Sequence, residues 1–255
     1  MREEIKNNIQ SSRYSVVNDQ TVTSLIEKES LKYKKKKDIE NSVRAKLHAW
    51  ITMFYENYSK FLKNIDSVEI DDDFLNEILK NHVSTRERFD FLQEFYKDID
   101  AHADNVKTIT DLGAGFNPIA YYLYSNNKDV KYFAYDIEKK GIELLNACFN
   151  KLKIDYYAKE KDVSINVNFE ESDMFFMFKL LPLLEQQKKG SSIELVKNVK
   201  TKKICITYPT RTLSGKNVGM YAKYKNDIQA LMQACDLKLI FEKEYKNEIL
   251  FILEK

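Results

Sequence analysis

The segment DLGAGFNP, Asp111 to Pro118, carries the sharpest chemical signal in the sequence. It follows the apolar run VKTITDL and precedes the helical run IAYYLYSN. Gly113 and Gly115, with Ala114 between them, permit unusual backbone angles and a close approach of the backbone to a ligand. The helix that follows offers free N–H groups at its N-terminus. The segment therefore predicts a turn that could hold a nucleoside or a carboxylate.

A carboxylate at the end of the next apolar run narrows the choice of ligand. Asp136 closes KYFAYDI, about twenty residues downstream, where an acid can accept both hydroxyls of a ribose. A dinucleotide-binding turn would have a third glycine where Pro118 stands, which counts against a pyrophosphate ligand. Two glycines after a strand often make only a tight turn. Together with Asp136, however, they favour an S-adenosylmethionine site.

Two arginines lie just before the predicted sheet, in HVSTRERF. Arg86 or Arg88 could hold the carboxylate of a cofactor, because the planar guanidinium matches that group with two parallel hydrogen bonds. The alternative is an N-capped helix with exposed arginines, which periodicity alone favours. His82 in the same segment is more typical of a packing or surface histidine than of a general base.

Two further loops should lie at the carboxyl edge of the sheet, where ligands bind in open α/β folds. FKLLPLLEQQ follows the fourth predicted strand, and YPTRTLSGK follows the fifth. Lys179, Arg211 and Lys216 lie in or next to these loops and could meet a phosphate or a base edge, although each alone is more often a solvated cation. Pro182 and Pro209 would shape the rims of the pocket.

The first hundred residues are predicted to be helical. Apolar residues recur at helical spacing from Gln20 to about Tyr58 without glycine or proline, which predicts two amphipathic helices. Phe74–Leu79 and Phe89–Ile99 are predicted to be further helical segments. We therefore expect an all-helical domain over residues 1–104.

The sequence changes character after about Asn105, where short apolar runs alternate with polar or helical stretches. The runs VKTITDL, KYFAYDI, SINVNF, MFFMF and KKICITY predict a parallel sheet with crossover helices. LKLIFEKEYKNEILFILEK predicts a final antiparallel hairpin that turns at Lys246–Asn247. The fold class is thus α/β over residues 105–255.

The net charge of +2 conceals two basic segments. Residues 28–46 hold eight Lys or Arg against three acids, and residues 188–225 hold ten against Glu194 alone, while six carboxylates lie between Asp66 and Glu77. Such runs are often only solvated helix faces, but two of them favour a polyanionic partner such as nucleic acid. The candidate RNA-binding residues are Lys34, Lys35, Lys36, Lys37, Lys200, Lys202, Lys203 and Lys216.

Composition excludes several classes of protein. With 255 residues, 44% of them hydrophobic, 6 glycines and 3 prolines, the chain is typical of a globular protein rather than of a collagen-like or disordered one. The longest apolar stretch, Met174 to Leu184, is too short to span a membrane. The three cysteines are too widely spaced for a CxxC pair, and the N-terminus has no apolar signal region. We expect a cytoplasmic protein without disulfides or a metal site.

Taken together, HVSTRER, DLGAGFNP, AYDI, FKLLPLLEQQ and YPTRTLSGKNVGM closely resemble the aminoglycoside-resistance 16S rRNA methyltransferases that modify N7 of guanine-1405. The resemblance covers about residues 40–254. It implies a Rossmann-like class I methyltransferase sheet and S-adenosylmethionine as the methyl donor. It also implies an N-terminal helical domain that docks on the assembled 30S ribosomal subunit, and resistance to aminoglycosides. We expect the protein to be a monomer.

The same resemblance suggests roles for individual residues. Arg88, with Arg86 as a second candidate, would hold the methionine carboxylate. Within the motif that starts at Asp111, Gly113 and Ala114 would line the methionine moiety. Asp136 and Ile137 would contact the ribose and adenine. The target base would lie between the segments Lys179, Leu180, Leu181, Pro182 and Tyr208, Pro209, Thr210.

The acid that contacts adenine in such enzymes follows the third strand, and here it has two candidates. Asp162 and Asp173 can each be aligned with it, and an ungapped alignment places Asn166 there. We favour Asp173, because INVNFEESD has the form of a strand followed by an acid.

Guanine N7 requires no catalytic base, because its lone pair lies in the ring plane and carries no proton. This agrees with a sequence in which no His, Cys or Lys is marked as an activated nucleophile. Tyr208 could stack on an unstacked target base, or it could be the buried end of the fifth strand. The alternatives are methylation of another rRNA position, adenine included, and a non-catalytic RNA-binding module with a vestigial cofactor fold.

Overall fold

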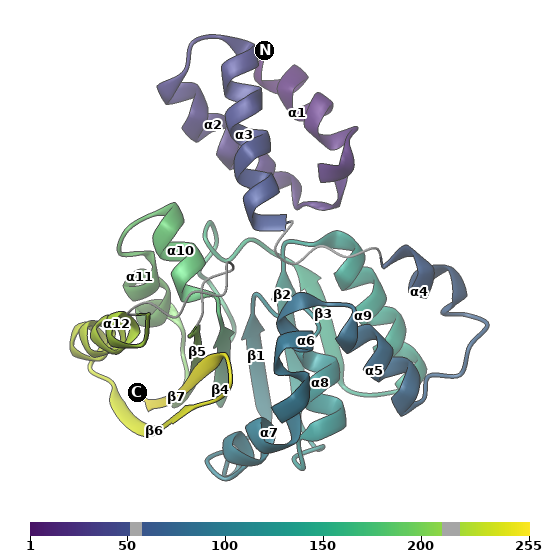
Figure 1. Ribbon diagram of the computed structural model, residues 1–255, viewed down its shortest axis with the longest axis vertical. Helices are drawn as coiled ribbons and strands as arrows, with labels where there is room; N and C mark the ends of the chain where they lie inside the picture. The colour runs from purple at the N-terminus through teal and green to yellow at the C-terminus, as the bar shows by residue number, and fades with distance from the viewer. Residues whose placement is uncertain (52–57, 211–219) are drawn as a thin grey trace.

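A computed structural model describes residues 1–51, 58–210 and 220–255 of the chain (Figure 1). Its strands are β1 (Thr108–Leu112), β2 (Lys131–Asp136), β3 (Tyr156–Glu160), β4 (Met174–Phe178), β5 (Lys203–Pro209), β6 (Lys238–Glu244) and β7 (Glu248–Glu254). Its α-helices are α1 (Arg2–Gln10), α2 (Asp19–Lys32), α3 (Lys36–Ile51), α4 (Ser59–Asn64), α5 (Asp72–Lys80), α6 (Val83–Arg88), α7 (Leu92–Asp100), α8 (Asn117–Tyr124), α9 (Lys139–Leu152), α10 (Leu181–Gln187), α11 (Ser191–Asn198) and α12 (Met220–Cys235).

The strands form one sheet in the order β3-β2-β1-β4-β5-β7-β6. Strands β1 to β5 pair in parallel, and β7 pairs antiparallel with both β5 and β6. The predicted α/β sheet with a final antiparallel hairpin is therefore confirmed. Lys246 and Asn247 lie between β6 and β7, where the turn was expected.

The third strand differs from the prediction. SINVNF, residues 164–169, forms no strand, and β3 is Tyr156–Glu160 instead. The polar stretch after β3 is held in a turn, since Ser164 N donates to Asp162 Oδ1 at 2.8 Å and Asn166 N donates to Asp162 O at 3.1 Å. Alternating polar and apolar residues alone could not distinguish this turn from an edge strand.

Side chains that alternate along the strands divide the core into two layers. Met174, Phe176 and Phe178 of β4 pack on the face covered by α4, α5 and α7 to α9. Phe175 and Met177 pack on the opposite face with α10, α11 and α12. Figure 1 shows these two groups of helices on either side of the sheet. The arrangement is a doubly wound sheet whose parallel strands end at one common edge.

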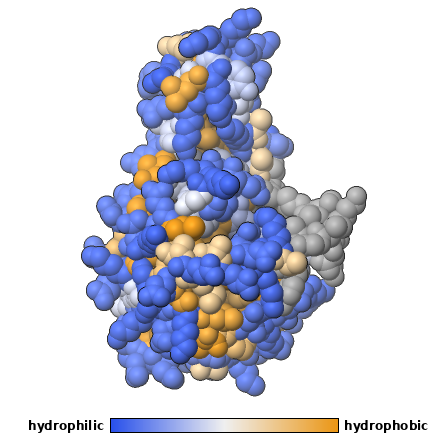
Figure 2. All heavy atoms as spheres, turned by 90° about the vertical axis from the view of Figure 1, so that its left-hand side faces the viewer, coloured by the Kyte–Doolittle hydropathy of each residue, from blue (hydrophilic) through white to orange (hydrophobic). Residues whose placement is uncertain are grey.

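Helices α1, α2 and α3 form a separate small unit with its own core, which includes Ile5, Ile9, Leu25, Val43 and Leu47. It stands above the carboxyl edge of the sheet in Figure 1, and it forms a narrow, mainly hydrophilic lobe in Figure 2. No helix in the described part of the chain combines the length and apolarity needed to cross a membrane.

One hydrophobic core extends across residues 104/105, where the sequence predicted a domain boundary. Apolar side chains of α4, α5 and α7, such as Phe61, Leu79 and Phe95, belong to the same core as Ile109 of β1. These helices are thus part of the α/β unit, and the separate helical unit ends with α3. The change in residue pattern near Asn105 marks where the first strand begins. It does not mark the end of a helical domain, because packing between distant elements decides which helices share a core.

Candidate functional site

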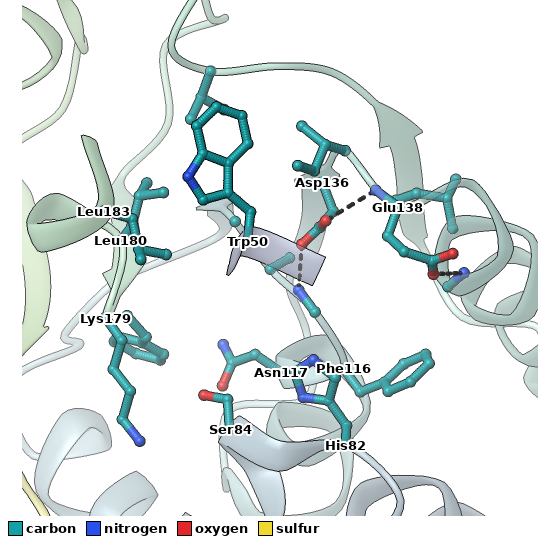
Figure 3. Close-up of a pocket in the computed structure, with 18 of the residues that line it drawn as sticks. Trp50, His82, Ser84, Phe116, Asn117, Asp136, Glu138, Lys179, Leu180 and Leu183 are labelled. Carbon is teal, nitrogen blue, oxygen red and sulfur yellow. Dashed lines mark hydrogen bonds between the residues drawn. The ribbon is translucent and has the colours of Figure 1, made fainter. Parts of the chain in front are cut away.

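A cavity opens at the carboxyl edge of the sheet, next to β1, where the strand order reverses (Figure 3). Such a switch point is where open α/β sheets bind ligands. The cavity is lined by the loops after β1, β2, β3 and β4, by α6, and by residues of the α1–α3 unit. Its lining includes Val17, Thr21, Trp50, His82, Arg88, Gly113, Ala114, Gly115, Asn117, Asp136, Ile137, Glu138, Asp162, Lys179, Leu180 and Leu183.

The glycine turn lies at this cavity as predicted. Gly113 and Gly115 have φ angles of +69° and +49°, which side chains rarely tolerate. The N–H groups of Gly113 and Ala114 donate to Tyr135 O at 2.9 and 3.1 Å, so the turn is tied to the end of β2. A Cβ on Gly115 would lie 2.7 Å from His82 Cε1. The turn is therefore a rigid wall of the cavity.

Asp136 is anchored on this turn. Its Oδ2 accepts from Gly115 N at 2.9 Å and its Oδ1 from Glu138 N at 3.1 Å (Figure 3). Burial raises the pKa of this carboxyl above its usual value, against the effect of the hydrogen bond from Gly115. A carboxylate held in this way can accept from hydroxyl groups in the cavity.

The sequence prediction missed Glu138, which also lines the cavity. It is the N-cap of α9, with its carboxylate accepting from Lys140 N and Gly141 N at 3.1 and 2.5 Å. Burial raises its pKa to about 7. Glu138 directly precedes the first residue of α9, and an acid at a helix N-terminus is a favourable pattern that could have identified the residue.

Asp111, the first residue of the motif predicted to bind the cofactor, is not among the cavity-lining residues. It is buried, and its Oδ2 accepts from Asn117 Nδ2 at 2.8 Å and from Tyr132 Oη at 2.7 Å. Burial raises its pKa to about 7, against the effect of those two hydrogen bonds. Asp111 thus supports the cavity from behind, because Asn117 is itself a lining residue.

A buried charge cluster forms one wall. Arg88 is 1% exposed, and its Nε and Nη2 donate to the two carboxylate oxygens of Glu248 at 2.5 and 3.1 Å. Lys179 Nζ lies 3.2 Å from Glu248 Oε2 and 2.7 Å from Glu87 Oε2. Burial opposes the charge on Glu248, but Arg88 and Lys179 outweigh it and hold its pKa below the usual value. Glu248 was not predicted as a site residue.

The two predicted arginines are therefore placed differently. Arg88 lines the cavity with its guanidinium already paired, whereas Arg86 is exposed, lies outside the lining, and donates to Lys80 O at 3.4 Å. The helix α6 carries both side chains, and only one of them faces inward.

The predicted base-binding segments are only partly at the cavity. Lys179 and Leu180 line it, while Pro182, the second residue of α10, lies outside the lining. Tyr208 is 3% exposed and stacks on Tyr224 with ring centroids 4.6 Å apart, so it is the buried end of β5 and not an open stacking surface.

The rest of the second segment is only partly described. Pro209 is half-buried at the end of β5, and Thr210 is buried with its N–H donating to Asn247 O at 2.9 Å. Arg211 and Lys216 lie outside the described residues.

The two candidate acids lie at opposite edges of the sheet. Asp162, after β3, lines the cavity next to Val163. Asp173 precedes β4 at the amino edge, where its Oδ2 accepts from Lys107 N and Thr108 N, both at 2.9 Å. The strand-then-acid pattern that favoured Asp173 is absent from the structure, because β3 ends at Glu160 and Asp162 is the acid that follows it.

The predicted RNA-binding lysines lie in two distant places in the structure. Lys34, Lys35 and Lys37 are exposed where α2 meets α3, and Lys36 pairs with Glu4. In contrast, Lys200, Lys202 and Lys203 lie at the amino edge, and Lys203 Nζ donates to His102 O at 2.6 Å. These three lysines therefore lie away from the cavity, which opens at the carboxyl edge.

The comparisons with known proteins agree with this geometry. The family described as ribosomal RNA methyltransferase (FmrO) matches residues 10–239. The chain belongs to this family. It is also 31% identical over 207 residues to the 16S rRNA (guanine(1405)-N(7))-methyltransferase of Micromonospora echinospora, a match that covers 78% of this chain and 74% of that one. The enzyme of the same name from Proteus mirabilis is 27% identical and is covered to 94%, against 96% of this chain.

Among solved structures, the 16S rRNA methyltransferase RmtF in complex with S-adenosyl-L-homocysteine superimposes with a TM-score of 0.88. The match has 24% identity and covers 100% of this chain and 98% of RmtF. At that identity it shows the shared fold. The FmrO-family member described here thus has the class I methyltransferase sheet and the helical N-terminal unit of its relatives.

Proposed function

We propose that the protein transfers a methyl group from S-adenosylmethionine to N7 of guanine-1405 in 16S rRNA of the assembled 30S subunit. The modification would give resistance to aminoglycosides of the kanamycin and gentamicin type. Membership of the FmrO family and the shared name of the relatives support the reaction. The observation that carries the proposal is the cavity itself, where a glycine turn, two carboxylates and a buried cation pair converge.

The lining residues fit S-adenosylmethionine. Asp136 offers an anchored carboxylate of the kind that accepts ribose hydroxyls, and Asp162 offers a second acceptor for the adenine amino group. Gly113 presents bare backbone where a side chain would narrow the cavity, since a Cβ on Gly113 would lie 3.1 Å from Leu180 Cδ1. When bound, the cofactor supplies an electrophilic methyl group on sulfur.

The charge cluster fits the carboxylate of the methionine moiety. Arg88 and Lys179 carry two positive charges, and the fully buried Glu248 carries one negative charge. Glu87, the second partner of Lys179, is exposed to solvent. Arg88 uses three of its five N–H donors on Glu248 and, at 3.4 Å, on Asn117 Oδ1, so it retains donors for another carboxylate. The cluster therefore offers N–H donors to a carboxylate at the wall of the cavity.

The chemistry asks the protein to position the reactants rather than to move a proton. Guanine N7 attacks with an in-plane lone pair, so rate enhancement comes from holding it in line with the methyl group. The titration of His82 agrees with this, because burial lowers its pKa to about 3 and leaves the ring neutral. Trp50, Leu180 and Leu183 provide the apolar surfaces at the cavity in Figure 3.

The α1–α3 unit is proposed to dock on the ribosomal subunit. Its exposed lysines Lys34, Lys35 and Lys37 would add affinity for phosphates without reading sequence. The unit stands above the cavity, so docking would bring the target base to the same edge of the sheet. We propose that the protein acts as a monomer in the cytoplasm, where the subunits are assembled.

The decisive experiment measures tritium transfer from labelled S-adenosylmethionine to purified 30S subunits, with naked 16S rRNA and 70S ribosomes in parallel. Borohydride and aniline then cleave the RNA at any N7-methylguanine. We expect one cleavage, at guanine-1405, with 30S subunits alone. Transfer without N7-type cleavage would contradict the target atom, and no transfer to any substrate would favour a non-catalytic RNA-binding protein.

A further inference from the structure

The cavity is not built by the α/β unit alone. Its lining includes Val17, just before α2, Thr21, in the first turn of α2, and Trp50, near the end of α3. Figure 3 shows the Trp50 ring beside Asp136 and across from Leu180 and Leu183. The unit that is proposed to dock on RNA is therefore also a wall of the cofactor cavity.

The segment from Val17 to Thr21 is fixed on the loops that follow β2 and β3. Asn18 N donates to Ile137 O at 2.9 Å, and Asn18 Nδ2 donates to Glu160 Oε1 at 2.5 Å. Val17 forms an antiparallel bridge with Glu138, and Asp19 pairs with Lys139 at 2.5 Å. These contacts set the position of α2 relative to the acids of the cavity.

Thr21 reaches one of those acids directly. Its side chain is 2% exposed, and its hydroxyl donates to Asp162 Oδ2 at 2.6 Å. The other oxygen, Oδ1, accepts from Ser164 N and Ser164 Oγ at 2.8 and 2.6 Å. The loop of Asp162 thus holds one side of the carboxylate, and α2 holds the other side.

We propose that Thr21 is a positioning residue for cofactor binding and that it acts through Asp162. This inference rests on the proposed function, since it assumes that S-adenosylmethionine occupies the cavity. A carboxylate oxygen has two acceptor sites, so Oδ2 can accept from Thr21 and still accept from an amino group in the cavity. Without the hydroxyl, the carboxylate is held only through Oδ1 by Ser164, so Oδ2 is less well fixed and its hydrogen bond to adenine weakens.

Calorimetric titration with S-adenosylhomocysteine tests the proposal on the full chain. We expect Thr21→Val, which keeps the shape and removes the hydroxyl, to weaken binding about tenfold, as loss of a hydrogen bond to a charged group does. Thr21→Ser should restore binding to within about twofold, since it restores the donor. Thr23→Val is the matched control on the same helix, because the Thr23 hydroxyl donates to Asp19 O rather than to the cavity.

A double-mutant cycle shows whether the effect passes through Asp162. In an Asp162→Asn background, Thr21→Val should cause little further loss of affinity. An equal loss in both backgrounds, or wild-type affinity in Thr21→Val with only a lower melting temperature, would overturn the proposal. Thr21→Ala provides a second removal of the hydroxyl if the valine variant fails to fold. If the wild type itself does not bind S-adenosylhomocysteine, it is the proposed function that fails.

Discussion

Arg88 and Glu248 form a bidentate ion pair in the interior although 160 positions separate them in the chain. The pair joins α6 to the start of β7, and the guanidinium also lies over the rings of Phe95 and Phe178, with centroid distances of 4.7 and 5.0 Å. Aromatic faces and a carboxylate together hold a fully buried cation in one orientation. Arg88 therefore meets the cavity as a fixed group.

This pair predicts a strong effect of removing its anion. Glu248→Gln leaves Arg88 and Lys179 buried with too little negative charge, and we expect the free energy of unfolding to fall by about 3–5 kcal/mol. Denaturant unfolding of the wild type and of Glu248→Gln measures this difference in the free energy of unfolding. Glu194→Gln, which breaks the exposed pair with Lys188, should change stability by less than about 1 kcal/mol. If both substitutions changed the free energy of unfolding by the same small amount, Glu248 would not be the anion that stabilises the buried Arg88 and Lys179.

The glycine turn predicts a difference between two substitutions at positive φ. Gly115→Ala places a Cβ 2.7 Å from His82 Cε1, whereas Gly190→Ala, at φ +84°, meets no atom within 4 Å. In both variants the free energy of unfolding should fall by about 1–2 kcal/mol, because alanine is strained in the left-handed backbone conformation. Only in Gly115→Ala should it fall by roughly 1–3 kcal/mol more, because of overpacking. It alone should also weaken S-adenosylhomocysteine binding. Thermal unfolding measures the stabilities, and calorimetry measures the affinities. The same stability and the same affinity in the two variants would contradict the prediction.

Asp111 predicts a pH dependence of stability. Its pKa is raised from 3.8 to about 7 in the folded protein, so between these values the folded state retains a proton that the unfolded chain has released. Stability is therefore lost as the pH rises through this window, and Asp111→Asn removes that loss. We expect the wild type to lose roughly 1–3 kcal/mol relative to the variant between about pH 5 and about pH 8. The raised pKa of Glu138 is present in both proteins and cancels. Parallel stability curves would contradict the prediction.

Local signals predicted what local interactions determine. The turn from Asp111 to Pro118 and the hairpin at Lys246–Asn247 are specified by neighbouring residues, and the structure has both. Asp162 could not be chosen over Asp173 without knowing where β3 ends, which its pairing with β2 decides. From the sequence alone, Glu248 is only an acid beside a turn. Its burial depends on the ion pair with Arg88, which is far away in the chain. Non-local packing likewise placed α4, α5 and α7 in the sheet core.

The exposed lysines between α2 and α3 predict a separation of RNA binding from cofactor binding. Reversing two charges in this segment, Lys34→Glu with Lys35→Glu, should weaken binding to 30S subunits about tenfold at moderate salt, because fewer counterions are released. Affinity for S-adenosylhomocysteine should stay within about twofold, since neither lysine lines the cavity. Filter binding and calorimetry measure the two affinities.

The matched control reverses the charges of Lys200 and Lys202, which lie at the opposite edge of the sheet, and it should change 30S binding less. Equal losses of both ligands in the first variant would mean that it perturbs the fold of the α1–α3 unit instead of its contact with rRNA.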